Sequence, residues 1–158
     1  MAAITVRQAT ARDADTLSLL NADVQALHAA ALPQWFKPPG PESFPPGAAA
    51  ALIAKPENLI FLAEAGAEPT GYAYAEVVRQ PETPFRRAYE MVYIHHISVR
   101  PAHRREGVGS ALVEAVRAAA GELGITLLGA DVWSFNDDAR AFFRRHGFTA
   151  FNERLWTR

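Results

Sequence analysis

Apolar and polar residues follow two periods along the chain, one typical of strands and one typical of helices. Residues 4–10 alternate and are rich in β-branched side chains, which predicts a first strand. From Thr10, a suitable N-cap, an amphipathic helix is predicted because apolar residues recur every three or four positions. These residues are Ala14, Leu17, Leu20, Val24 and Leu27. Six prolines between Pro33 and Pro46 end that helix and predict a long irregular segment.

The rest of the pattern predicts further strands and helices in alternation. Strands are expected at 58–65, 71–80, 88–99, 125–133 and 148–156, and helices at 47–55, 110–121 and 136–148. The run 125–133 is almost continuously apolar, as expected for a strand buried on both faces. This order predicts an α/β protein with a sheet of mixed direction. No repeat and no long linker divides the chain, so residues 1–158 are predicted to form one domain.

Composition and charge narrow the functional classes. The formal net charge is −1, so no overall basic field attracts nucleic acid or an anionic membrane, and neither is an expected partner. The absence of cysteine excludes disulfides, thiolate metal sites and a cysteine nucleophile. The N-terminal residues show no signal-peptide pattern, and no apolar run approaches the roughly 20 residues that span a bilayer. The default expectation is a cytoplasmic protein.

The segment RREGVGS, residues 104–110, joins a strand-like run to a helix-like run. The first N–H groups of a helix have no internal partner and carry partial positive charge, so this turn is suited to binding an anion. Gly107 and Gly109 allow close approach to these groups, and Arg104 and Arg105 can add charge-assisted contacts. The chain has neither a P-loop nor an early Rossmann fingerprint. Taken alone, the glycine pair is explained at least as well by a helix that simply begins with glycines.

The surroundings of this segment carry a resemblance to a known family. Arg104, Gly107 and Gly109, preceded by IHHISVRPAH and followed by SALVEAVRAAA, resemble motif A of the GNAT superfamily of acyl-CoA N-acyltransferases. The later NDDARAFFRRHGF is similar to the family pattern NxxAxxFYxxxGF, and the resemblance extends over nearly the whole chain. It implies a GNAT-type α/β fold with a mixed, mostly antiparallel central sheet and helices on both faces.

The resemblance also implies acetyl-CoA as the cofactor, with coenzyme A as co-product and no metal. The implied pyrophosphate loop consists of Arg104, Arg105, Glu106, Gly107, Val108, Gly109 and Ser110. The backbone of Ile97, Ser98 and Val99 is implied to pair with the pantetheine arm like an added strand. Asn136 and Phe142 match family positions that contact the arm near the thiol.

Phe143 departs from the family pattern, because this position commonly holds a tyrosine that acts as general acid. Without a phenol there, another group such as Tyr93 or a water protonates the sulfur, or the thiolate leaves unprotonated. A thiol with a pKa of about 8.5 is a tolerable leaving group near neutrality. The same departure motivates an alternative function, a non-catalytic or weakly catalytic acyl-CoA sensor.

A base is expected on the strand at 88–99, since some family members use a histidine or a glutamate there. Strand alternation predicts two faces; Tyr93, His95, Ile97 and Val99 share one, and Val92, Ile94, His96 and Ser98 the other. His95 is the first choice because an imidazole titrates near neutral pH, and Glu90 and His96 follow. Each histidine is also compatible with a purely structural role. Zinc is not expected, because only adjacent His95 and His96 cluster.

The acceptor is expected to be a primary amine of a small molecule or of a protein or peptide, with the small molecule favoured. Trp35 and Phe36, with Phe44, are aromatics in the proline-rich segment that can wall its pocket or simply anchor that segment. Tyr74 and Glu76 alternate with Tyr72 on one strand face, where Glu76 can meet an ammonium group. The loop PETPFRR is a further candidate wall, and a homodimer is left open.

Overall fold

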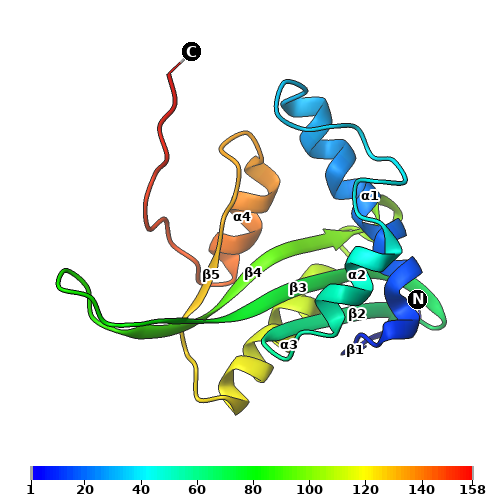
Figure 1. Cartoon of the computed structure of the whole chain (residues 1–158). Helices are drawn as coiled ribbons and strands as arrows, with labels where there is room; N and C mark the ends of the chain where they lie inside the picture. The colour runs from blue at the N-terminus through cyan, green and yellow to red at the C-terminus, as the bar shows by residue number, and fades with distance from the viewer. Residues whose placement is uncertain (1, 158) are drawn as a thin grey trace.

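The computed structural model describes residues 2–157 and contains a five-stranded sheet in the order β1-β2-β3-β4-β5 (Figure 1). The strands are β1 (Ile4–Gln8), β2 (Asn58–Ala65), β3 (Glu68–Gln80), β4 (Tyr89–Val99) and β5 (Leu128–Ala130). Among the first four, each strand runs antiparallel to its neighbours, whereas β5 runs parallel to β4. The predicted mixed and mostly antiparallel sheet is therefore confirmed.

Helices cover both faces of this sheet, as predicted. They are α1 (Ala14–Ala31), α2 (Pro46–Ile53), α3 (Val108–Glu122) and α4 (Asp137–Arg145), with short 3-10 turns at Ala11–Asp13 and Pro101–His103. One core lies between the sheet and α1 with α2, and is formed by residues such as Leu17, Leu20, Leu62 and Tyr72. The other lies between the sheet and α3 with α4, and contains Ile94, Leu112, Val116 and Phe143. Two opposite cores fix which face each strand side chain reaches.

A β-bulge interrupts the pairing of β3 with β4 at His95. Tyr74 lies opposite His96, but the next residue, Ala75, lies opposite Ile94, so His95 is the extra residue on β4. A bulge places two residues of one strand against one of its neighbour and shifts the alternation of side chains beyond it. The strictly alternating faces predicted for this strand are therefore wrong past Ile94.

The shift brings the two histidines of β4 to the same face. Before the bulge, Val92 faces the core under α3; beyond it, Ile97 and Val99 pack against that same core. His96 instead bonds to a tyrosine of the opposite core, and Ser98 Oγ donates to the carbonyl of Leu20 in α1. His95 and His96, which strict alternation would place on opposite faces of β4, therefore both lie on the face toward α1.

The strands β4 and β5 separate soon after they meet. Their parallel pairing covers only Val92–Ile94 against Leu128–Ala130, and within residues 2–157 no strand pairs with β4 on that side beyond Ile94. The buried strand predicted at 125–133 is thus wrong in extent, since β5 has three residues and all are half-buried. A parallel pair needs a continuous ladder of hydrogen bonds, and an apolar sequence alone does not supply one.

The strand predicted at 148–156 is also wrong. Residues 148–157 form no regular element, and Phe151 and Leu155 are almost fully exposed. In Figure 1 this red segment runs away from the sheet to the C-terminus. Its alternating sequence suits a strand, but a strand requires a neighbour to accept and donate its backbone hydrogen bonds.

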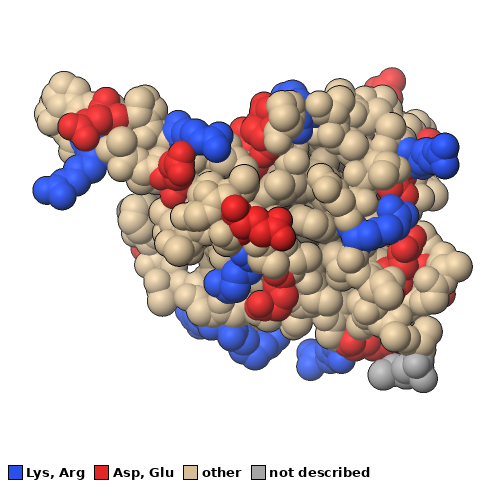
Figure 2. All heavy atoms as spheres, turned by 90° about the horizontal axis from the view of Figure 1, so that it is seen from below, with Lys and Arg blue, Asp and Glu red and all other residues tan. Residues whose placement is uncertain are grey.

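The hairpin between β3 and β4 projects as an arm from the body of the molecule, at the left of Figures 1 and 2. Phe85 at its tip is 95% exposed. On the face seen from below, Figure 2 shows Lys and Arg interspersed with Asp and Glu. This face therefore presents no field of a single sign.

Candidate functional site

The bulge on β4 holds a histidine that is hydrogen-bonded to a glutamate of the neighbouring strand. His95 Nε2 lies 2.6 Å from Glu76 Oε2 on the neighbouring strand β3, and each side chain is about one third exposed (33% and 35%). A carboxylate only accepts hydrogen bonds, so His95 Nε2–H donates to Glu76 and Nδ1 is the ring nitrogen left for a substrate. This pairing joins a predicted base to a predicted acceptor-binding residue.

Two tyrosines enclose the His95 ring. Tyr74 stacks on it with ring centroids 4.7 Å apart, and Tyr93 meets it edge-on at 4.8 Å. Burial, followed by the neighbouring Asp131 carboxylate, raises the pKa of Tyr93 above its ordinary value. Burial and then Glu76 raise the pKa of Tyr74 likewise. Both phenols therefore keep their protons at neutral pH.

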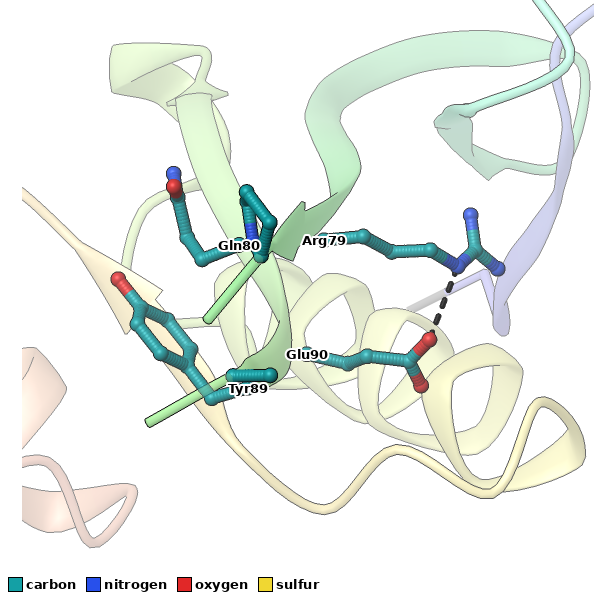
Figure 3. A pocket seen from close by; sticks show the side chains of 6 residues that line it. Arg79, Gln80, Tyr89 and Glu90 are labelled. Carbon is teal, nitrogen blue, oxygen red and sulfur yellow. Dashed lines mark hydrogen bonds and ion pairs between the residues drawn. The ribbon is translucent and has the colours of Figure 1, made fainter. Parts of the chain in front are cut away.

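Glu90, a predicted alternative base, lies elsewhere. It is on the hairpin arm, where its Oε1 accepts a 2.9 Å hydrogen bond from Arg79 Nε (Figure 3). Five residues of strand, or roughly 17 Å, separate it from His95 along β4. A hollow of about 540 Å³ at this place is lined by Arg79, Gln80, Pro81, Ala88, Tyr89 and Glu90. The structure does not bring Glu90 to the glutamate–histidine pair.

His96 sits deeper than His95 on the same face. Its Nδ1 lies 2.9 Å from Tyr72 Oη, and Tyr72 Oη in turn accepts a 2.9 Å hydrogen bond from Asn21 Nδ2 of α1. Burial, followed by the charges that His95 and His28 can carry, lowers the pKa of His96 to about 4. At neutral pH this imidazole is therefore uncharged, and it is a much weaker base than an ordinary histidine.

The predicted phosphate loop forms a turn that leads into α3. Arg105 has φ +64° and Gly107 has φ +86°, so both adopt the left-handed conformation. Gly107 is the N-cap of α3 and contributes no side chain, so the first N–H groups of that helix stay open to a ligand. A Cβ at Gly107 meets nothing within 4 Å, so its backbone conformation and not a lack of space favours glycine.

Glycine is favoured at position 109 for a different physical reason. A Cβ there lies 3.0 Å from the ring of Phe142, because α4 packs directly onto the first turn of α3. Ser110 Oγ and His146 Nε2, 3.0 Å apart, link the same two helices. Sequence reasoning assigned this glycine to phosphate approach alone and missed the helix contact, which no local spacing reveals.

The other side chains of the loop are partly engaged within the protein. Glu106 Oε2 lies 3.0 Å from His103 Nδ1, and Arg104 Nε donates to the carbonyl of Val99 at 3.4 Å. Just before the loop, β4 runs from His95 to Val99 with its second edge unpaired by any strand of the described chain. An unpaired strand edge that ends at open helix N–H groups fits an extended arm followed by phosphates.

The residues predicted near the thiol lie on α4. Asn136 is its N-cap, and its Oδ1 accepts a 3.1 Å hydrogen bond from the N–H of Ala139. Phe142 is half-buried against Gly109, whereas Phe143 is 7% exposed and packs on Phe148 with ring centroids 5.0 Å apart. At the position of the family's tyrosine, this chain therefore has a core ring without a hydroxyl.

Aromatic side chains connect the proline-rich segment with the loop after β5. The ring of Phe36 lies 5.0 Å from that of His28 in α1 and 5.1 Å from that of Trp133. Trp35 is 59% exposed and meets Trp156 at 4.9 Å. Trp133 and His28 were not singled out from the sequence, because their proximity to Phe36 depends on packing between distant segments.

Residues 2–157 include no group of three or more histidine, aspartate or glutamate side chains placed to hold a metal ion. In this same range, no helix has the length and apolar character required to cross a membrane.

Comparison with known proteins places the chain in a class. Residues 26–148 match the model of the acetyltransferase (GNAT) family, and no curated protein matches. The chain therefore belongs to the GNAT family of acetyltransferases.

Solved structures share the fold. A tetramutant of the BH1408 protein from Bacillus halodurans has a TM-score of 0.92 at 19% identity, covering 98% of this chain and 99% of that one. The aminoglycoside N-acetyltransferase AAC(6')-Iy in complex with CoA has a TM-score of 0.74 at 18% identity, covering 100% and 95%. A ribosomal-protein-alanine N-acetyltransferase from Brucella melitensis has a TM-score of 0.73 at 19% identity, covering 99% of each chain.

Proposed function

We propose that this protein transfers an acetyl group from acetyl-CoA to a primary amine by direct attack in a ternary complex. The observation that carries the proposal is the position of the Glu76–His95 pair, at the bulge where the unpaired edge of β4 begins. That edge continues to the open N–H groups at the start of α3. Similar folds named for aminoglycoside and ribosomal-protein-alanine acetyl transfer support an amine acceptor.

Acetyl-CoA supplies the thioester carbonyl that the amine attacks. His95 Nδ1 takes a proton from the amine as the new N–C bond forms and the C–S bond breaks. Glu76 holds His95 Nε2–H and stabilises the imidazolium that results, so it acts as a positioning residue. Because aliphatic amines have a pKa near ~10, the acceptor arrives as an ammonium group, which the Glu76 carboxylate attracts. This group loses its first proton to water before the attack, and the proton that His95 takes is the second.

The open N–H groups of Gly107, Val108 and Gly109 are proposed to bind the pyrophosphate, assisted by Arg104 and Arg105. The edge of β4 at Ile97–Val99 is proposed to bind the pantetheine arm by added-strand hydrogen bonds. In this proposal residues 1–158 form one acyltransferase domain, and a homodimer is left open.

One observation favours a second function, that of an acyl-CoA sensor. Phe143 provides no phenol, so proton delivery to the leaving sulfur depends on Tyr93, on water, or on departure of the thiolate itself. A protein that binds acyl-CoA and transfers slowly or not at all is consistent with such a site. The two functions differ in turnover and not in binding.

The test measures release of the coenzyme A thiol from acetyl-CoA against a panel of small amines and of peptides with a free α-amino group, while calorimetry measures acetyl-CoA binding separately. We expect binding together with amine-dependent thiol release. Binding without acceleration by any amine or peptide supports the acyl-CoA sensor and contradicts the transferase.

A further inference from the structure

Three side chains from three elements form a hydrogen-bonded row that ends at His96. Asn21 Nδ2 of α1 lies 2.9 Å from Tyr72 Oη of β3, and Tyr72 Oη lies 2.9 Å from His96 Nδ1 of β4. Asn21 is 7% exposed and Tyr72 is 0% exposed, so water does not compete for these bonds. From the sequence, His96 was expected only as an alternative base, and nothing connected it with Asn21 or Tyr72.

The direction of each bond follows from the donors available. The amide nitrogen of Asn21 can only donate, so Tyr72 Oη accepts from it. Tyr72 then has a single hydrogen to offer, and it points to His96 Nδ1, which accepts. Burial raises the pKa of Tyr72, so the phenol keeps that hydrogen. A neutral imidazole that accepts at Nδ1 carries its own hydrogen on Nε2.

The other nitrogen of His96 is not completely buried. Every buried side-chain nitrogen or oxygen in the described part of the chain has a hydrogen-bond partner, and His96 Nε2 has none within it, so Nε2 is not buried. The ring lies edge-on to Phe44 at 5.7 Å and to Tyr74 at 5.3 Å. The His96 ring therefore lies between Phe44 of the proline-rich segment and Tyr74 of the strand face that also holds His95.

We propose that His96 is a fixed hydrogen-bond donor and not a base, and that it selects acceptors in which an oxygen lies close to the reacting amine. The adjacent Glu76–His95 pair attracts the ammonium group, whereas a neutral N–H does not. An amino alcohol or an amino carbonyl compound can place its ammonium group at the Glu76–His95 pair and its oxygen at His96 Nε2–H. A plain alkylamine can make only the first of these contacts. This inference rests on the proposed acyl transfer and adds the acceptor class to it.

The tautomer of His96 can be measured by NMR without any enzymatic turnover. Long-range ¹H–¹⁵N NMR of the histidine-labelled full chain at neutral pH distinguishes protonated from unprotonated ring nitrogens, and a His96→Phe sample assigns the signals. We expect an unprotonated Nδ1 and a protonated Nε2. A protonated Nδ1, with Asn21 turned to accept from Tyr72, overturns the proposal, as does a doubly protonated ring.

A variant pair tests what holds the tautomer. Tyr72→Phe removes the hydrogen that points to Nδ1 and is expected to give a mixture of tautomers. Tyr89→Phe, on the hairpin arm, is the matched control and leaves the His96 signals unchanged. A single Nε2–H tautomer in Tyr72→Phe contradicts the assigned role of the row.

Acceptor selection is tested with ethanolamine and propylamine, which differ by a hydroxyl in place of a methyl group. The ratio of their kcat/KM values, ethanolamine over propylamine, is expected to fall about tenfold in His96→Phe, the size of one hydrogen bond between neutral groups. An unchanged ratio overturns the selection. If no amine is acetylated by the wild type, the proposed function fails, whereas the NMR result still decides the tautomer.

Discussion

His95 Nε2 and Glu76 Oε2 lie 2.6 Å apart across β3 and β4, at the single residue where the pairing of these strands is interrupted. The bulge turns the His95 ring toward α1, and the Tyr74 ring, stacked 4.7 Å away, limits its rotation. The pair thus orients one imidazole nitrogen with a carboxylate and leaves the other for a substrate. This arrangement is the basis of the first prediction.

Replacing His95 by alanine is expected to lower kcat/KM for amine acetylation about 10²–10⁴-fold, the usual contribution of a general base. Glu76→Gln is expected to lower it less, about tenfold, because the amide can still hold Nε2–H but does not stabilise the imidazolium. Steady-state thiol release measures both. Glu122→Gln, exposed at the last residue of α3, is the control; a loss in His95→Ala no larger than in this control contradicts the assignment.

His96 is expected to make the folded protein less stable at acidic pH. The folded protein keeps this ring neutral down to a pKa of about 4, while in the unfolded chain it takes a proton below about 6.5. Falling pH therefore favours unfolding, and about 3 kcal/mol of stability is lost through this group between pH 6.5 and 4. His96→Phe is expected to lose correspondingly less stability over that range in urea denaturation.

The matched control for this titration is His103→Gln. Glu106 raises the pKa of His103, so its contribution to the pH dependence has the opposite sign. Parallel pH curves for the wild type and His96→Phe show that His96 does not titrate as assigned.

Gly109→Ala is expected to destabilise the fold by about 1–3 kcal/mol, because the added methyl group lies 3.0 Å from the Phe142 ring. Phe142→Leu in the same chain is expected to restore part of that loss by making room. Gly121→Ala, in the same helix with nothing within 4 Å of its Cβ, is expected to stabilise by about 0.5–1 kcal/mol. Thermal unfolding of the four proteins tests the helix contact, and equal effects at both glycines refute it.

Phe143→Tyr is expected to lower stability by about 1–3 kcal/mol, because its hydroxyl enters a core without a partner. We expect kcat to change less than twofold, since the thiolate leaves without help from this position. Thermal unfolding and single-turnover kinetics measure the two effects. A tenfold rise in kcat demonstrates instead that the phenol reaches the sulfur and that the acid position is vacant in the natural chain.

Individual residues show which features of the structure can be predicted from the sequence. The alternation of Tyr72, Tyr74 and Glu76 correctly placed these side chains on one face of β3, because the pairing of this strand with β2 is regular from Gly71 to Glu76. The same reasoning failed on β4, because the extra residue of a bulge lies in the pairing of two strands and not in either sequence. The alternation in 148–156 likewise described a strand for which the described chain provides no neighbour.

The sequence by itself determined the order of strands and helices as far as α4, the family, and the glycine–arginine turn that opens α3, because these depend on local periodicity and local backbone preference. Only the tertiary structure decided that His95 and His96 share a face, that Glu76 is the partner of His95, and that Gly109 makes room for Phe142. Each of these depends on contacts between residues distant in the chain. Such contacts exist only once strand register and helix packing are fixed.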